Sequence, residues 1–181
     1  MKDLSLHILD IAQNSISAGA GQVEITIEEQ PSENLYSLSI SDDGKGMDEE
    51  MRNKVTDPFF TTRTSRKVGM GIPLLKLNAE RTGGSFEIDS KKGNGTLIKA
   101  TFVFNHIDRL PEGDLAGTIV MMASANPSIQ FIYTHRTPAG KYTFDSREVQ
   151  EVLGEIPISE LSIYPYLKEM INENLKDIRI H

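Results

Sequence analysis

The stretch LHILDIAQNSISAGAGQVEITI, residues 6–27, contains a change of period that decides how the chain folds. Over residues 2–18 the apolar side chains share one half of a helical wheel: Leu4, Ile8, Leu9, Ile11, Ala12 and Ile16. Gly19 and Gly21 then end the helix, and QVEITIEE, residues 22–29, alternates as a strand does. The sequence therefore predicts an amphipathic helix followed directly by a β-strand.

The polar half of this helix carries Asp10 and Asn14. They are four residues apart, so their side chains lie next to each other and point the same way. The asparagine oxygen suits a hard cation that is already bonded to phosphates, and the aspartate could orient or deprotonate a water. The alternative is an ordinary solvated helix face. His7, in the same helix, is expected to flank such a site or to face solvent.

Downstream patterns predict two antiparallel hairpins with a loop and two helices between them. A turn at residues 31–34 leads into the alternating strand LYSLSIS, residues 35–41. A short helix is expected at residues 48–55, a polar loop at residues 57–71, and a helix from residue 72 that closes at Gly83 and Gly84. Residues 85–90 and 96–104 form the second hairpin around KKGNG.

Three glycine motifs follow the first helix in the sequence. In DDGKGM, residues 42–47, Asp42 could accept a hydrogen bond from an exocyclic amine such as that of adenine, while Gly44 and Gly46 let the backbone approach a ring. An acidic turn is the alternative. GMGI, residues 69–72, opens a helix and predicts an anion site beside a local basic cluster, and a flexible charged loop is its alternative. GNGT, residues 93–96, is what any hairpin turn would use.

The C-terminal third has a different pattern. The segments GTIVMMAS, IQFIYTHR and KYTFDS predict three strands, and helices are expected at residues 146–154 and 159–178. A boundary near residues 105–114 divides the chain into residues 1–104 and a C-terminal α+β extension, residues 105–181. The predicted fold class is an α/β two-layer sandwich, in which helices cover one face of a mixed, mainly antiparallel sheet.

Composition limits the choice of function. The chain has 181 residues, 38% hydrophobic and 25% charged, and a net charge of −7, so it offers no general electrostatic reason to bind nucleic acid or an anionic membrane. It has no cysteine, which excludes disulfides and thiolate metal sites. A signal-peptide pattern and an apolar run of about 20 residues are both absent, so we expect a cytoplasmic protein.

The order of these motifs resembles that of the Bergerat-fold (GHKL) ATPase superfamily of gyrase, heat-shock chaperones, histidine kinases and MutL. DIAQNSISAGA is similar to the family's N box and DDGKGM to its first glycine box. DPFFTT is similar to the F box of histidine kinases, VGMGIPLLK to the second glycine box, and GNGT to the third. The resemblance runs from about residue 4 to residue 104 and implies an ATP-binding domain that uses Mg²⁺.

The resemblance also implies a role for each matched residue. Asn14 would be the magnesium ligand, Asp42 the adenine-binding carboxylate, and residues 61–68 a short ATP lid. The residues expected to contact the nucleotide are Asn14, Asp42, Gly44, Gly46, Met47, Thr61, Thr62, Arg63, Lys67, Gly69, Met70, Gly71, Ile72 and Thr96. Asp10 is the expected catalytic base, because members that hydrolyse ATP or phosphorylate serine resemble one another in a glutamate at this position; aspartate is one methylene shorter.

Three functions are compatible with the sequence. The chain resembles anti-sigma-factor serine kinases, which implies a stand-alone ATPase or a protein kinase acting on a partner protein. It could instead be a non-catalytic switch in which ATP orders the lid, or the ATP-binding subunit of a split histidine kinase. A protein partner or phosphoacceptor is expected in each case, a homodimer is compatible with all three, and nucleic acid and membrane are not expected as partners.

Overall fold

The computed structural model of the chain describes residues 1–57 and 70–179. Its N-terminal elements are α1 (Leu4–Ser17), β1 (Gln22–Gln30), η1 (Pro31–Glu33), β2 (Leu35–Asp42), α2 (Glu49–Lys54), α3 (Gly71–Arg81), β3 (Phe86–Ser90) and β4 (Thr96–Val103). The elements that follow are α4 (Leu115–Ala125), β5 (Gln130–Thr137), β6 (Gly140–Asp145), α5 (Ser146–Leu153), η2 (Leu161–Ile163) and α6 (Tyr164–Ile178). None of these helices is both long and apolar enough to cross a membrane, over the residues described.

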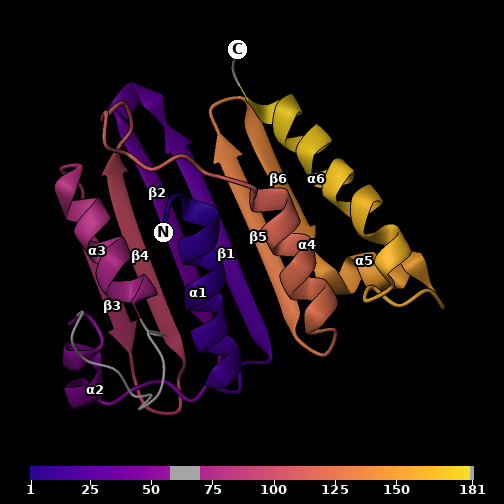
Figure 1. The fold of residues 1–181 in the computed structure, drawn as a ribbon, viewed down its shortest axis with the longest axis horizontal. Coiled ribbons are helices and arrows are strands. Elements are labelled where there is room, and N and C mark those ends of the chain that lie inside the picture. The colour runs from indigo at the N-terminus through magenta and orange to yellow at the C-terminus, as the bar shows by residue number, and fades with distance from the viewer. Residues whose placement is uncertain (58–69, 180–181) are drawn as a thin grey trace.

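The strands form one six-stranded sheet in the order β3-β4-β2-β1-β5-β6. Each neighbouring pair is antiparallel except β1 and β5, which run parallel. Helices α3, α1, α4 and α6 lie side by side over one face of this sheet (Figure 1). The predicted fold class, a mixed and mainly antiparallel sheet with helices on one face, is therefore confirmed.

The core lies between the helices and the sheet. Alternate residues of β1, namely Val23, Ile25 and Ile27, are fully buried on the face toward the helices. The apolar stripe of α1 packs on this face, with Leu4 and Ile8 among its fully buried side chains. The alternating apolar residues of β1 thus pack against the apolar stripe of α1, as the sequence predicts.

The C-terminal third continues this architecture. Strand β5 pairs with β1 along seven register positions, and β6 pairs with β5 at the edge of the sheet. The segment before α4 also meets the start of α1, because the N–H groups of Leu4 and Ser5 donate to the carbonyls of Pro111 and Glu112, both at 2.9 Å. The division of the chain after residue 104 stays a prediction, but the sheet itself continues across it.

The prediction of a strand at GTIVMMAS was wrong, because these residues form helix α4. Asp114 caps this helix by accepting a hydrogen bond from the N–H of Gly117 at 2.9 Å. The helix contacts α1, α6 and β5, and eight of its eleven residues are buried. A short helix that is apolar on nearly every side has little periodicity, so its sequence cannot be told from a buried strand.

The other predicted helices and strands are present with shifted ends, while the loop predicted at residues 57–71 lies almost entirely outside the described residues. The helix expected at residues 159–178 begins at Tyr164, after the short 3-10 turn η2, with Pro165 in its first turn. Proline is favoured at this position, because its missing N–H has no partner there in any helix. The sequence thus predicts the existence of this helix better than its first residue.

Candidate functional site

A cavity of about 510 Å³ opens beside the C-terminal half of α1. Its walls come from α1, the end of β2 and the turn after it, α2, the start of α3, and β4. This volume falls within the range of about 300–1,000 Å³ that is usual for small-molecule sites. The lining residues are Ile11, Asn14, Ser15, Ser17, Ala18, Ile40, Asp42, Lys45, Gly46, Met47, Asp48, Met51, Val55, Ile72, Lys92, Thr96 and Ile98.

Asp42 ends strand β2 and its carboxylate is held at both oxygens. Oδ2 accepts a 2.6 Å hydrogen bond from the Ser15 hydroxyl, and Oδ1 accepts one of 2.9 Å from the N–H of Gly44. Each carboxylate oxygen can accept a further hydrogen bond, since an ionised carboxylate offers about four lone-pair sites. Asp42 is thus a fixed acceptor at the cavity wall, suited to an exocyclic amine.

The turn after β2 and the turn between β3 and β4 pack tightly against each other. Gly93 N–H donates to the carbonyl of Lys45 at 2.6 Å. Gly46 has a φ of +68°, and a Cβ at this position would lie 2.0 Å from the carbonyl oxygen of Lys91. Only glycine combines this backbone conformation with so close an approach. The two turns therefore form one rigid wall of the cavity.

Asn14 lines the same cavity from α1, one residue before Ser15. Its neutral side-chain oxygen is a ligand that Mg²⁺ accepts, and Mg²⁺ commonly binds through one or two protein oxygens together with substrate phosphates. The donor chemistry at this position therefore fits a magnesium ion that is shared with a phosphate.

Asp10 contacts the start of α3 instead of the cavity. Its Oδ2 accepts a 2.9 Å hydrogen bond from the N–H of Gly71, the first residue of α3. A Cβ at position 71 would lie 2.2 Å from this oxygen, so glycine is what allows the carboxylate to approach. A negative charge at a helix N-terminus is favourable. Asp10 thus fixes α3 against α1, in addition to any chemical role.

His7 is completely buried, so the alternative in which it faces solvent was wrong, and the alternative in which it flanks the site stays a prediction. Helix α3 covers it: its Nδ1 lies 3.4 Å from the carbonyl oxygen of Gly71, and its Nε2 lies 3.3 Å from Nδ2 of Asn78. Burial lowers the pKa of His7, because the charged imidazolium loses its hydration. The polar half of α1 is therefore only partly solvated, since α3 packs on the turn that carries His7.

The structure brings together six of the predicted nucleotide-contacting residues. The cavity lining includes Asn14, Asp42, Gly46, Met47, Ile72 and Thr96. Four predicted residues within the described ranges do not line it: Asp10, Gly44, Met70 and Gly71. Gly44 nevertheless orients Asp42 through its N–H, and the N–H of Gly71 is engaged by Asp10. Five predicted residues lie outside the described ranges: Thr61, Thr62, Arg63, Lys67 and Gly69.

Sequence reasoning missed several lining residues, of which Ser15 is the most informative. Ser15 is a buried polar residue in line with Leu4, Ile8 and Ile11 on the apolar stripe of α1. A hydroxyl on such a stripe requires a hydrogen-bond partner, and this is a signal that the sequence did contain. Lys45 and Lys92, on the two packed turns, bring positive charge to the cavity lining and were also missed.

The family model for histidine kinase-, DNA gyrase B- and HSP90-like ATPases matches residues 2–106. Among curated proteins, the chain is 33% identical over 105 residues to the signal transduction histidine-protein kinase AtoS of Escherichia coli, covering 58% of the chain and 17% of that protein. It is 28% identical over 102 residues to sporulation kinase A of Bacillus subtilis, covering 56% of the chain and 16% of that protein. The chain thus spans about a sixth of the length of these relatives.

Two solved structures are similar in fold. One is the N-terminal domain of a DNA repair protein, with a TM-score of 0.58 and 16% identity over 86% of this chain and 58% of that one. The other is the ADP-bound MutL ATPase domain of Aquifex aeolicus, with a TM-score of 0.50 and 18% identity over 84% of this chain and 69% of that one. Both alignments extend beyond the part matched by the family model, so the similarity of fold includes residues after 106. With more than half of its length matched by the family model, the chain belongs to the histidine kinase-, DNA gyrase B- and HSP90-like (GHKL) ATPases.

Proposed function

We propose that this protein binds ATP together with Mg²⁺ in the cavity beside α1 and acts as an ATPase or a protein kinase. The observation that carries the proposal is that Asn14 and Asp42, which come from a helix and a strand 28 positions apart in the chain, line one cavity. Asp42 offers an acceptor for the adenine amine, and Asn14 offers a neutral oxygen for the metal. Membership of the GHKL ATPases supports the same ligand.

The remaining groups have separate parts in this proposal. Gly46 and the packed turns shape the adenine pocket, and Thr96 closes it. Thr96 is fixed for this purpose by a 2.8 Å hydrogen bond between its hydroxyl and that of Ser90, and Ser90 also accepts from the N–H of Met47 at 2.8 Å. Magnesium held by Asn14 would neutralise part of the phosphate charge. Lys67, Gly69 and the segment 61–68 keep their predicted role near the phosphates.

Asp10 is the candidate base in this proposal. It lies one helical turn before Asn14, and its hydrogen bond to Gly71 uses Oδ2. A role as base requires the other oxygen to reach the attacking water or hydroxyl, directly or through a second water. Phosphate would then pass either to water or to a partner protein. The likeness to anti-sigma-factor serine kinases is part of this proposal, and it rests on the carboxylate at position 10.

A second candidate function is a switch that binds ATP without consuming it. The position of Asp10 favours this function, because its carboxylate is engaged by the N–H of Gly71 and does not line the cavity. ATP would then act by ordering a segment beside the site, as nucleotides do in other switch proteins. A third candidate is the ATP-binding subunit of a split histidine kinase, which the similarity to histidine kinases supports.

Binding and product analysis test the proposal together. ATP is titrated calorimetrically with and without Mg²⁺ into the wild type, Asn14→Ala, and the matched control Gln13→Ala, whose side chain is exposed and outside the lining. We expect Mg²⁺ to strengthen ATP binding in the wild type and the control but not in Asn14→Ala. Absence of saturable ATP binding, or an unchanged effect of Mg²⁺ in Asn14→Ala, would overturn the proposal.

The products then separate the three candidates. Release of ADP and inorganic phosphate identifies an ATPase. Transfer of labelled phosphate to serine or threonine of a co-purified partner identifies a serine kinase, and an acid-labile label on histidine identifies a split histidine kinase. Recovery of intact ATP from saturated protein identifies the switch.

A further inference from the structure

A second cluster of ligand-type side chains lies at the opposite end of the sheet from the cavity. Glu29 is six residues beyond Val23, which pairs with Asp42, so it lies roughly 20 Å farther along β1. His135 is near the end of β5, and Glu112 is in the segment between β4 and α4. Three segments that are distant in the sequence therefore place an imidazole and two carboxylates together.

The two strand residues face the interior of the molecule. His135 pairs in register with Ile27, so it shares the core-facing row of β1 and β5 with the fully buried Ile25, Ile27 and Tyr133. Glu29 follows Ile27 by two positions on the same row. His135 is 0% exposed, and the Glu29 and Glu112 side chains are each 17% exposed. Ionisable groups in such positions require specific partners, because burial removes their hydration.

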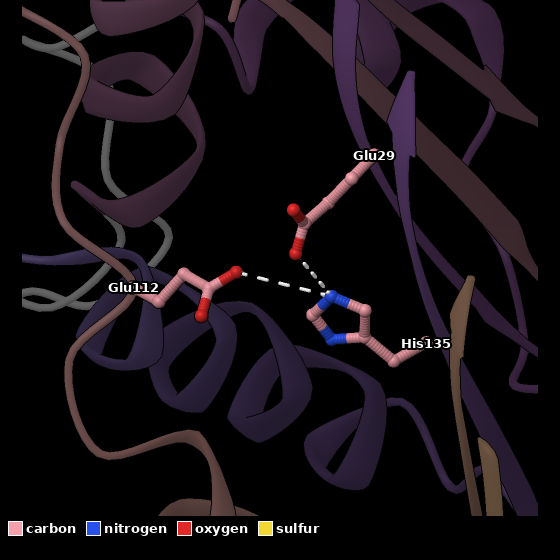
Figure 2. Close-up of side chains that lie close together, drawn as sticks. All are labelled: Glu29, Glu112 and His135. Carbon is pink, nitrogen blue, oxygen red and sulfur yellow. Dashed lines mark hydrogen bonds and ion pairs between the residues drawn. The ribbon is translucent and has the colours of Figure 1, made fainter. Parts of the chain in front are cut away.

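The three side chains point at one another (Figure 2). His135 Nε2 lies 2.7 Å from Glu29 Oε1 and 4.0 Å from Glu112 Oε1. All three ligand atoms lie within 4.8 Å of one another. The two carboxylates approach the same ring nitrogen from different elements, so one small cation can reach all three donors.

Two of the three donors, His135 and Glu112, are also held by hydrogen bonds to residues outside the cluster. The second ring nitrogen of His135, Nδ1, is 2.7 Å from the Tyr133 hydroxyl. The Tyr36 hydroxyl donates to Glu112 Oε1 at 2.9 Å, and Arg179 donates to the other oxygen, Oε2, of the same carboxylate. Outer partners of this kind fix the orientation of metal ligands, and a ligating histidine nearly always hydrogen-bonds through its other nitrogen.

We propose that Glu29, Glu112 and His135 form a binding site for a divalent first-row transition metal, with Zn²⁺ as its best-matched ion. One imidazole and two carboxylates are donors that zinc accepts, and three protein ligands leave a fourth position for water. The proposal goes beyond ATP binding, because it concerns a separate site.

The two separations from His135 require only a small rearrangement. A tetrahedral ion about 2.0–2.1 Å from each donor keeps the donor atoms about 3.3 Å apart. The observed separations from His135 Nε2, 2.7 and 4.0 Å, lie on either side of this value. Glu29 therefore moves outward and Glu112 inward by roughly 0.6 Å, which glutamate side chains achieve by small rotations.

The hydrogen bonds of the His135 ring are compatible with a metal ion on Nε2. Without a metal, His135 Nε2 lies 2.7 Å from Glu29 Oε1 and Nδ1 lies 2.7 Å from the Tyr133 hydroxyl, and the tautomer decides which atom donates in each contact. With a metal on Nε2, the ring carries its single proton on Nδ1 and donates it to the Tyr133 oxygen. Arg179 binds the Glu112 oxygen that does not face His135, so its charge compensates one carboxylate. The ligand oxygen, Oε1, accepts from the Tyr36 hydroxyl and keeps a second lone pair for the ion.

Metal titration of the full chain tests the proposal. The protein is stripped with a chelator, kept free of nucleotide, and titrated with ZnCl₂ against a chromophoric competitor. We expect one zinc ion per chain, and Glu29→Gln and His135→Gln should each weaken binding by at least about 100-fold, more than the loss of an outer partner costs. The matched controls are Glu28→Gln, the next glutamate on β1, and His106→Gln, in the loop after β4; both should bind like the wild type.

Two further measurements do not depend on the variants being well folded. Zinc should raise the melting temperature of the wild type, and Co²⁺ bound in its place should give the intense visible absorption of a four-coordinate site. X-ray absorption of the zinc form should show one imidazole ligand. The proposal is overturned if the wild type binds no stoichiometric zinc, if folded Glu29→Gln and His135→Gln bind it equally well, or if the bound zinc has no imidazole. ATP affinity of Glu29→Gln, unchanged from the wild type, confirms that the two sites are independent.

Discussion

Ser15 donates a 2.6 Å hydrogen bond to Asp42, and this contact joins helix α1 to the end of strand β2 at the wall of the cavity. The same helix presents Asn14 one residue earlier. The proposed adenine-binding residue, Asp42, and the proposed metal-binding residue, Asn14, are therefore linked through the side chain of Ser15. The hydrogen bond fixes the position of one relative to the other.

Removal of the Ser15 hydroxyl tests this link. Ser15→Ala should leave the chain folded but allow the Asp42 carboxylate to rotate, which should cost about 1–2 kcal/mol of ATP binding, or roughly 5- to 30-fold in dissociation constant. Calorimetric titration measures the change. Ser39→Ala, which removes a hydroxyl from β2 away from the cavity lining, is the control and should bind ATP normally. Equal affinities in both variants would contradict the link.

Asp42 and its neighbour Asp43 form a matched pair of carboxylates. Asp42→Ala should abolish measurable ATP binding, because it leaves the exocyclic amine of adenine without its acceptor, at a cost of about 1–3 kcal/mol or more. Asp43 instead accepts hydrogen bonds from the N–H groups of Gln22 and Gly21 at 2.9 and 2.8 Å, and these bonds lower its pKa. Asp43→Ala should therefore retain ATP binding, as measured with a fluorescent nucleotide. Similar losses in the two variants would remove Asp42 from the adenine site.

Two substitutions of Asp10 separate its structural contact from its chemistry. An asparagine oxygen can still accept from the N–H of Gly71, so Asp10→Asn should bind ATP normally and lose turnover. Asp10→Ala removes the contact as well, and should in addition lower the midpoint of urea unfolding. Turnover is followed by ADP release at saturating ATP. Full turnover in Asp10→Asn would leave Asp10 as a positioning residue for α3 only.

Two glycines with positive φ make a further matched pair. Gly46→Ala should lower the free energy of unfolding by well over 2 kcal/mol and weaken ATP binding, because its Cβ would collide with the Lys91 carbonyl in addition to the strain of about 1–2 kcal/mol. Gly93 has a φ of +89°, and no atom of the described residues lies within 4 Å of an added Cβ. Gly93→Ala should therefore cost the strain alone. Urea unfolding of both variants gives the comparison, and equal costs would show that the turns can move apart.

The burial of His7 should make the folded protein less stable at acid pH. Burial lowers the pKa of His7 below its ordinary value of 6.5, so the unfolded chain takes up a proton at a higher pH than the folded chain does. The free energy of unfolding should therefore decrease as the pH falls below about 6.5, by at most about 1.4 kcal/mol per pH unit.

Urea midpoints at pH 7.5, 6.5 and 5.5 measure this dependence. His7→Gln should reduce it, and His106→Gln, at a partly exposed loop position, should not. A dependence that is unchanged in His7→Gln would exclude His7 as its source.

The sequence was sufficient to predict those helices and hairpins whose hydrophobic pattern lies within one short segment. Helix α1, the hairpin of β1 and β2, and the hairpin of β3 and β4 each have a clear period and a glycine-containing or proline-containing turn, and all were predicted. Helix α4 was not, because burial against α1, α6 and β5 removes the polar face that would have revealed its period. The parallel pairing of β5 with β1 also has no local signal, since its register depends on residues more than 100 positions apart.

The order of the motifs predicts that Asn14 and Asp42 belong to one site, and both residues line one cavity, while their roles stay predictions. The contact between Asp10 and Gly71 depends on how α3 packs against α1, which no local pattern records. The approach of Glu29, Glu112 and His135 likewise depends on non-local pairing, because each residue alone looks like an ordinary surface group in the sequence.

The position of β1 has a practical consequence for anyone who shortens this protein. Residues 22–28 of β1 are hydrogen-bonded to β5 on the side away from β2. A fragment that ended with the family-matched part would expose this line of N–H and C=O groups, and an open edge of that kind readily recruits strands from other molecules. The first turn of α1 would also lose the Pro111 and Glu112 carbonyls that its N–H groups now use. A fragment limited to the family-matched part would thus turn β1 from an interior strand into an exposed edge that favours self-association.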